Sequence, residues 1–191
     1  MNVIIIDKTE NPIDVISRAA GTCYGKDDAS QKRVTSCFNK GHFGVFEHAS
    51  FTARIEGISR ACSHQLVRHR LASFCQESQR YTKYDPIGDD WYVMPEDFNG
   101  VQLEEFAEQD YRQAMSQYAF NYRSAISNGV KPEDARYLLP EAMKTSIVMT
   151  MDVRELFHFL DMRTDKAAQW EIRNLAWNDW IRPRMPLRSV S

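Results

Sequence analysis

The 191-residue sequence has no apolar run of the roughly 18 residues that a membrane-spanning helix needs, and its N-terminal apolar run is too short for a signal peptide. It has no CxxC pair, because Cys23, Cys37, Cys62 and Cys75 are scattered, as in reduced cytoplasmic proteins. An excess of positive charge is also missing, since the net charge is -2 and the pI is about 6.2. General nucleic-acid binders are usually basic. We therefore expect a cytoplasmic protein whose partners include neither nucleic acid nor a membrane.

Internal repeats and low-complexity segments are absent as well, and 43% of the residues are hydrophobic, which is enough for one sizeable core. We therefore expect a single domain over residues 1–191. The hydrophobic periodicity predicts both strands and helices, and hence an α/β protein. The predicted strands are residues 3–6, 51–57, 91–94 and 145–151. The predicted helices are residues 12–20, 28–40, 58–71, 101–127, 132–139, 153–162 and 165–180.

Three local features allow more than one interpretation. The small-residue segment 20–25 either lets the backbone approach a ligand or serves as an ordinary connector. His42 and His48 flank Glu47, but their spacing fits no zinc pattern, so structural histidines are favoured over metal ligands. The aromatic stripe of the helix predicted at 101–127 favours a core or a subunit interface over a cofactor site.

The strongest functional signal is the stretch from Gln65 to Tyr81, QLVRHRLASFCQESQRY. Arg68, His69, Arg70 and Arg80 lie in it, with Ser and Gln side chains between them. Arginine presents a planar fork of donors to phosphate or carboxylate, and Ser and Gln add neutral hydrogen-bonding groups. Apolar residues interrupt the charges, which a merely solvated basic face does not require. The stretch therefore predicts a nucleotide-phosphate site where a helix runs into a loop.

The spacing of these residues resembles the signature of the flavin-dependent thymidylate synthases. That signature is Arg-His-Arg, seven residues, Ser, one residue and Arg, and it is matched by Arg68-His69-Arg70, Ser78 and Arg80. Similar segments occur at 42–48 and 132–140 and in the C-terminal half, so the resemblance covers at least residues 42–175. It implies the fold of that family, an α+β type in which helices flank a central mixed or antiparallel sheet.

The resemblance implies reductive methylation of dUMP to dTMP, with methylenetetrahydrofolate as carbon donor and FAD reduced by NADPH. It also implies a homotetramer with shared active sites, no cysteine nucleophile and no metal. Carried over residue by residue, the flavin is held by His42, Gly44, Arg68, His69, Arg70, Gln76, Asp152, Arg154 and His158. The dUMP is bound by Gln65, Arg68, Gln76, Glu77, Ser78, Gln79, Arg80, Arg136 and Arg163.

Arg163 carries the catalytic role that the resemblance implies. A fixed cation against the pyrimidine favours loss of the N3 proton, because it stabilises the anion that develops there. The residues alone leave another interpretation open, in which an arginine at a helix end hydrogen-bonds the terminal carbonyls.

Two positions depart from the family pattern. Cys75-Gln76 replaces the Asn-Glu of many members, which leaves open whether Gln76 or Glu77 faces the nucleotide. His158 stands where the family often has Asn, and its charge depends on pH. Two other functions remain as alternatives: a non-catalytic nucleotide- or RNA-binding module, and a flavoprotein that methylates another pyrimidine.

Overall fold

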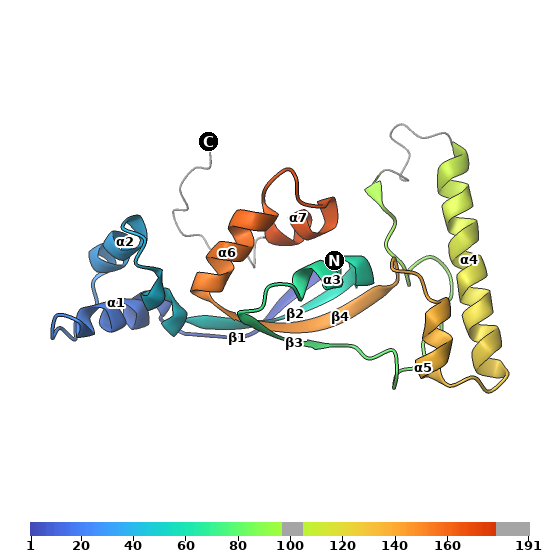
Figure 1. Cartoon of the computed structure of the whole chain (residues 1–191), viewed down its shortest axis with the longest axis horizontal. Coiled ribbons are helices and arrows are strands. Elements are labelled where there is room, and N and C mark those ends of the chain that lie inside the picture. The colour runs from blue at the N-terminus through green and yellow to red at the C-terminus, as the bar shows by residue number, and fades with distance from the viewer. Residues whose placement is uncertain (97–104, 179–191) are drawn as a thin grey trace. The chain divides into compact units, whose positions relative to one another are not determined.

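A four-stranded antiparallel sheet with the order β1-β2-β4-β3 lies at the centre of the fold (Figure 1). The computed structural model describes residues 1–96 and 105–178. The strands are β1 (Asn2–Lys8), β2 (Ser50–Ser59), β3 (Ala72–Gln76) and β4 (Lys144–Asp152). Every second side chain of β4 is buried, because successive residues of a strand point to opposite faces. The predicted α/β class is confirmed. Of the two expected sheet types, mixed or antiparallel, the sheet is antiparallel.

Strand β2 continues past Gly57, where the sequence predicted its end. The buried positions change there from odd to even numbers, from Ala53 and Ile55 to Ile58. Gly57 has a φ of 73°, a left-handed conformation that carries no Cβ penalty in glycine. Such a one-residue shift is typical of a β-bulge, after which the strand continues but the side chains that faced one side of the sheet face the other. The predicted strand end is therefore wrong.

Among the described residues, one compact unit comprises Met1–Ile55, Gln65–Cys75 and residues 148–178. Helix α1 packs on α2 and on the 3-10 helix η1, and η1 packs on α6 (Figure 1). The helical elements of this unit are α1 (Pro12–Thr22), α2 (Gln31–Asn39), η1 (Phe43–His48), α6 (Val153–Arg163) and α7 (Trp170–Ala176).

An apolar cluster joins α1, α2, η1 and α6. Phe157 of α6 meets Phe38 and Phe46 edge-on, with ring centroids 5.2 and 5.3 Å apart, a favourable aromatic geometry. The fully or nearly fully buried members of the cluster are Ile16, Val34, Phe46, Ala49 and Val153. This packing holds the first turn of α6, where the predicted flavin residues Asp152 and Arg154 lie.

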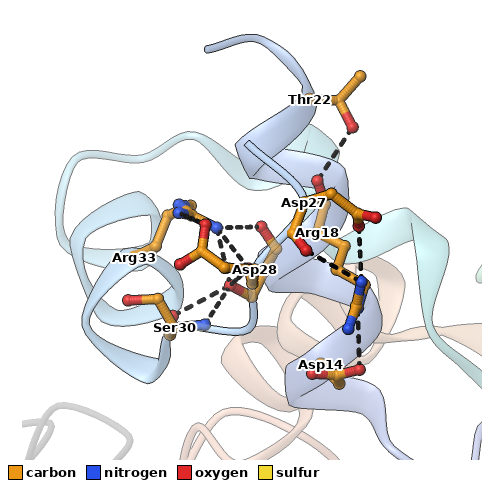
Figure 2. Close-up of polar contacts among 8 residues, drawn as sticks. Asp14, Arg18, Thr22, Asp27, Asp28, Ser30 and Arg33 are labelled. Atoms are coloured by element: carbon orange, nitrogen blue, oxygen red, sulfur yellow. Dashed lines mark hydrogen bonds and ion pairs between the residues drawn. The ribbon is translucent and has the colours of Figure 1, made fainter. Parts of the chain in front are cut away.

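Two arginines fix the connection between α1 and α2 (Figure 2). Arg18 donates through Nη1 to Asp27 at 2.6 Å and through Nε to Asp14 at 3.1 Å. Arg33 donates through Nη2 to Asp28 at 2.7 Å, and this hydrogen bond lowers the pKa of Asp28. Gly21 lies beside them, and its carbonyl accepts from the N–H groups of Tyr24 and Lys26. In segment 20–25 the backbone thus closely approaches other residues of the chain, which favours the interpretation of this segment as an ordinary connector.

We expect Gly21→Ala to destabilise the protein by about 1–3 kcal/mol, the usual effect of overpacking a filled site. An added Cβ lies 2.5 Å from the Lys26 carbonyl oxygen and 2.8 Å from Nη1 of Arg33. Urea unfolding measures the effect as a lower midpoint at unchanged slope. Gly44→Ala is the matched control, because its Cβ meets nothing within 4 Å. Equal midpoints for the two variants contradict the packing argument.

The other compact unit comprises Glu56–His64 and Gln76–Ile147. Its long helix α4 (Glu105–Ser127) packs on α5 (Pro132–Ala135) and on the 3-10 helix η3 (Arg136–Leu138) (Figure 1). Met115, Ala119 and Tyr122 of α4 are buried, whereas Tyr118 and Phe120 are 42% and 66% exposed. The helix thus has a core face and exposed aromatic residues. The start predicted for it at residue 101 lies outside the described residues.

The Arg68-His69-Arg70 segment is not helical, contrary to the sequence prediction. Helix α3 (Arg60–Leu66) ends five residues before the predicted Leu71, and residues 67–71 turn into β3. The loop predicted after this helix is therefore partly a strand. The reason is tertiary, since β3 pairs with β4 and this pairing overrides helix propensity.

Two further elements are shorter than predicted. The predicted strand 91–94 is reduced to a single bridge between Tyr92 and Met143. The helix predicted at 165–180 begins at Trp170, and residues 179 and 180 lie outside the described residues. Across residues 1–96 and 105–178, no helix combines the length and apolar character that a membrane crossing requires.

Candidate active site

His69 connects the signature segment to α6. Its side chain is only 2% exposed. Its Nδ1 lies 3.0 Å from Oε1 of Glu155, and its Nε2 lies 3.0 Å from Nε of Arg163. The ring of Phe159 meets the imidazole edge-on, with a centroid distance of 5.0 Å. The fold therefore brings a predicted flavin residue into direct contact with the predicted catalytic arginine.

These contacts define the protonation of His69. A guanidinium can only donate hydrogen bonds, so Nε2 of His69 accepts from Arg163 and the ring proton is on Nδ1, which donates to Glu155. Burial lowers the pKa of His69; the hydrogen bond to Glu155 opposes this shift, and the charge of Arg163 adds to it. His69 is therefore a neutral imidazole in the Nδ1–H form at neutral pH.

Arg163, the last residue of α6, points toward the signature segment. Its Nη2 lies 3.4 Å from the Gln65 carbonyl oxygen, and within the described part of the chain its Nη1 has no acceptor. The Leu160 carbonyl at this helix end accepts instead from the N–H and the hydroxyl of Thr164. The helix-end interpretation of Arg163 is therefore not the arrangement that the structure has.

Asp152 and Glu155, three positions apart, predict a capping box at the start of α6, and half of it is confirmed. Asp152 Oδ1 accepts from the Glu155 N–H at 2.8 Å, which is the predicted N-cap. The Glu155 side chain, however, is 3% exposed and accepts from His69. Glu155 thus belongs to the candidate site, which its neighbours in the sequence do not indicate. Its only local signal, a carboxylate at the third helical position, is also what a capping box requires.

Several cations lie at the surface of the same compact unit. Arg68 and Arg70 are exposed, and neither guanidinium group has a hydrogen-bond acceptor within residues 1–96 and 105–178. Arg154 pairs with Glu47, and both side chains are about half exposed. His158 is exposed one turn further along α6. Exposed guanidinium groups are suited to the phosphates of a dinucleotide.

The two remaining flavin candidates of this unit surround the start of η1. His42 precedes η1 and is exposed, and Gly44 within it is exposed with open space at its Cβ position. Neither residue forms a hydrogen bond with His69, Glu155 or Arg163, so their assignment depends on the resemblance.

The phosphate candidates of the other unit lie around Glu133. Arg80 donates through Nε to Glu133 at 2.7 Å, and this hydrogen bond lowers the pKa of Glu133. The charges of Lys131 and Arg136 make smaller contributions in the same direction. Arg136 is exposed, and the described residues offer its guanidinium group no hydrogen-bond acceptor. Two predicted phosphate-binding arginines from distant stretches are thus close enough to act on one carboxylate.

The segment between β3 and Arg80 is fixed by hydrogen bonds within that unit. Gln76 Nε2 donates to Ser63 at 2.8 Å and to Thr145 at 3.3 Å. The carbonyl of Glu77 accepts from Arg60 at 2.7 Å. The other two substrate candidates are held as well: the Ser78 hydroxyl accepts from the Arg80 N–H, and the Gln79 amide contacts Met143. The amide of Gln76 thus has an internal role, and which of Gln76 and Glu77 faces the nucleotide stays open.

The ring and carboxylate atoms of His69, Glu155 and His158 lie within 4.8 Å of one another, a geometry that also suits a metal ion. Both ring nitrogens of His69 are already used, one as donor to Glu155 and the other as acceptor from Arg163. His69 therefore has no lone pair left for a cation, and the hydrogen-bonded arrangement accounts for the cluster.

The fold and these groups define an α/β protein that presents cationic side chains suited to nucleotide phosphates. The sequence model of the family described as thymidylate synthase complementing protein matches residues 4–185. A flavin-dependent thymidylate synthase of Geobacter sulfurreducens is 44% identical over 188 residues, which cover 92% of this chain and 79% of that protein. The Pyrococcus furiosus enzyme of the same name is 37% identical over 189 residues, 93% of this chain and 76% of that protein.

The structure of this chain is similar to the solved structure of a relative. It is similar to the flavin-dependent thymidylate synthase ThyX of Helicobacter pylori in complex with FAD and dUMP, with a TM-score of 0.74 and 26% identity over 92% of this chain and 90% of the other. The chain belongs to the family of flavin-dependent thymidylate synthases, enzymes of thymidylate biosynthesis.

Proposed function

We propose that this chain converts dUMP to dTMP by reductive methylation, with methylenetetrahydrofolate as carbon donor and NADPH as the source of electrons. The observation that carries the proposal is the 3.0 Å hydrogen bond between His69 and Arg163, which are 94 positions apart. It joins the signature segment to the residue that the family resemblance assigns to the pyrimidine.

The residues of the first unit fit a bound FAD. Arg68 and Arg70 are exposed cations without an acceptor in the described chain, and Arg154 and His158 add donors on one side of α6. Such groups bind the diphosphate and orient the ring system. FAD, when bound, supplies the hydride chemistry. The roles proposed for His42, Gly44, Gln76 and Asp152 are supporting ones. His69 acts through its backbone or its ring face, because both ring nitrogens are engaged.

The arginines proposed to bind dUMP differ in the charge that they contact: the phosphate charge is constant, whereas the pyrimidine charge develops during the reaction. Arg80 and Arg136 bind the phosphate, whose charge is present throughout the reaction. Ser78, Gln79, Gln65 and Glu77 add hydrogen-bonding groups around the nucleotide. Arg163 presents its terminal nitrogens to the pyrimidine, where negative charge develops as the N3 proton leaves.

None of the cysteines acts as nucleophile in this proposal. Cys62 is buried, Cys37 is partly buried, and Cys23 and Cys75 are exposed without an activating base at recognisable spacing. All four are free thiols, which supports a cytoplasmic location. The exposed Tyr118 and Phe120 of α4 support a homotetramer with shared active sites, because such aromatic residues are enriched in interfaces.

Tritium release from dUMP labelled at C5 tests the proposed function. We expect a yellow protein that releases tritium only when NADPH and methylenetetrahydrofolate are both supplied, because replacement of the C5 hydrogen completes the methylation. Arg70→Ala is the matched variant, and we expect it to fold but to lose the flavin absorbance and the release. A colourless wild-type protein that binds RNA supports the binding-module alternative. A yellow protein that releases tritium from a different pyrimidine nucleotide makes that nucleotide the substrate.

A further inference from the structure

We propose that Glu155 is a positioning residue that acts through His69 to hold the guanidinium of Arg163 in the orientation that the pyrimidine requires. The inference rests on the proposed function, in which Arg163 acts on dUMP. It adds to the reaction a residue that lies outside the signature and outside the set carried over from the family.

Glu155 is placed with little freedom. Its backbone N–H is bound by Asp152 at 2.8 Å, and its side chain is only 3% exposed. Burial of a carboxylate is unfavourable unless it is hydrogen-bonded, and Glu155 meets this need with the Nδ1–H of His69 at 3.0 Å. The first turn of α6 itself is held by the buried Val153 in the apolar cluster. The acceptor for His69 is therefore fixed before any ligand binds.

The position of the proton on the His69 ring decides whether this ring can accept a hydrogen bond from Arg163. With Glu155 accepting at Nδ1, the lone pair of His69 is on Nε2 and faces the Nε–H of Arg163. In the other tautomer, Nε2–H faces Nε–H, and two donors oppose each other. A carboxylate accepts and cannot donate, so it selects the productive tautomer, whereas an amide at the same position can donate to Nδ1 and stabilise the wrong one.

The anchored Nε leaves the other edge of the guanidinium for a ligand. Nη2 makes a long 3.4 Å contact with the Gln65 carbonyl, and Nη1 has no acceptor among the described residues. Because a guanidinium is planar, fixing Nε and Nη2 fixes the direction of the Nη1 donor as well. The Glu155–His69–Arg163 chain thus determines where the catalytic cation points.

A double-mutant cycle separates positioning from a merely structural role. We expect Glu155→Gln to lower kcat at saturating dUMP by about 10- to 100-fold, the usual range for residues that orient a reacting group, with KM for dUMP little changed. In the Arg163→Ala background the same substitution is expected to lower kcat no further, because its effect passes through Arg163. Glu155→Asp, which keeps the carboxylate, is expected to lose less than Glu155→Gln.

Glu171→Gln of α7 is the matched control, since Glu171 is also only 3% exposed. We expect Glu171→Gln to change kcat by the same factor in the wild-type and in the Arg163→Ala background, whatever the size of that factor. If Glu155→Gln also loses the same factor in both backgrounds, Glu155 is only a structural residue and the proposal fails.

Nitrogen-15 NMR of the histidine rings gives a test that does not depend on turnover. In the wild-type protein we expect the His69 ring in the Nδ1–H form, identified by the loss of its signals in His69→Asn. A ring that is Nε2–H overturns the proposal. Absence of tritium release from wild-type protein whose His69 is Nδ1–H refutes the proposed function and leaves the arrangement of the three side chains intact.

Discussion

Arg163→Ala is expected to lower kcat for dTMP formation by about 100- to 1,000-fold, with a much smaller change in KM for dUMP. The effect falls on kcat because the charge that Arg163 stabilises appears only as the pyrimidine loses its proton. Arg163 also needs no reorganisation to act, since His69 and Gln65 already hold two of its nitrogens. Arg163→Lys keeps a positive charge but loses the planar group that bonds to His69, and it should remain impaired.

Steady-state kinetics at saturating dUMP measures this loss, and Arg173→Ala provides the control. Arg173 lies on α7 of the same compact unit and donates through Nη1 to the carbonyls of Lys166 and Ala168. These hydrogen bonds hold the segment before α7, so the role of Arg173 is structural. We expect its loss to lower thermal stability and to leave kcat near the wild-type value. If raising dUMP restores the kcat of Arg163→Ala to that of wild type, Arg163 contributes binding only.

Arg80→Ala and Arg136→Ala are expected to raise KM for dUMP, each by about tenfold, while kcat changes less. Phosphate is charged in substrate, transition state and product, so a group that binds it stabilises all three equally. The magnitude is at the low end for hydrogen bonds to charged groups because the Arg80 side chain is 57% exposed and solvent screens its charge. Arg80 binds Glu133 through Nε, which leaves its terminal nitrogens for phosphate.

Arg123→Ala is the control for these two variants. Arg123 is equally exposed, at 57%, and lies 3.8 Å from Asp85 on the surface of the same compact unit. We expect its loss to leave KM for dUMP unchanged, which separates a specific phosphate contact from a general loss of positive charge. An unchanged KM in Arg136→Ala removes Arg136 from the substrate site, and a large fall in kcat in Arg80→Ala assigns Arg80 to the chemical step.

The local parts of the fold were predictable from the sequence. The alternation of apolar residues in β4, the helix-start signals at Pro12 and Asp152 and the apolar face of α6 are properties of neighbouring residues. These elements were found within a few positions of their predicted bounds. The signature from Arg68 to Arg80 is equally local. It sufficed to indicate the family, and the resemblance to that family predicted a catalytic role for Arg163.

Only the tertiary structure decided how these local features are used. Residues 67–76 were predicted as helix and loop, but the pairing of β3 with β4 ended α3 at Leu66, because sheet hydrogen bonds outweigh a weak helix propensity. The continuation of β2 past Gly57, which the left-handed φ of this residue permits, could not be read from the local sequence either. Glu155 shows the limit most clearly: its sequence neighbours predict a helix cap, whereas its contact with His69 spans 86 positions. The sequence by itself determined the family and predicted which residues carry the chemistry; packing across long sequence separations decided that the buried Glu155 and His69 come into contact with one of them, Arg163.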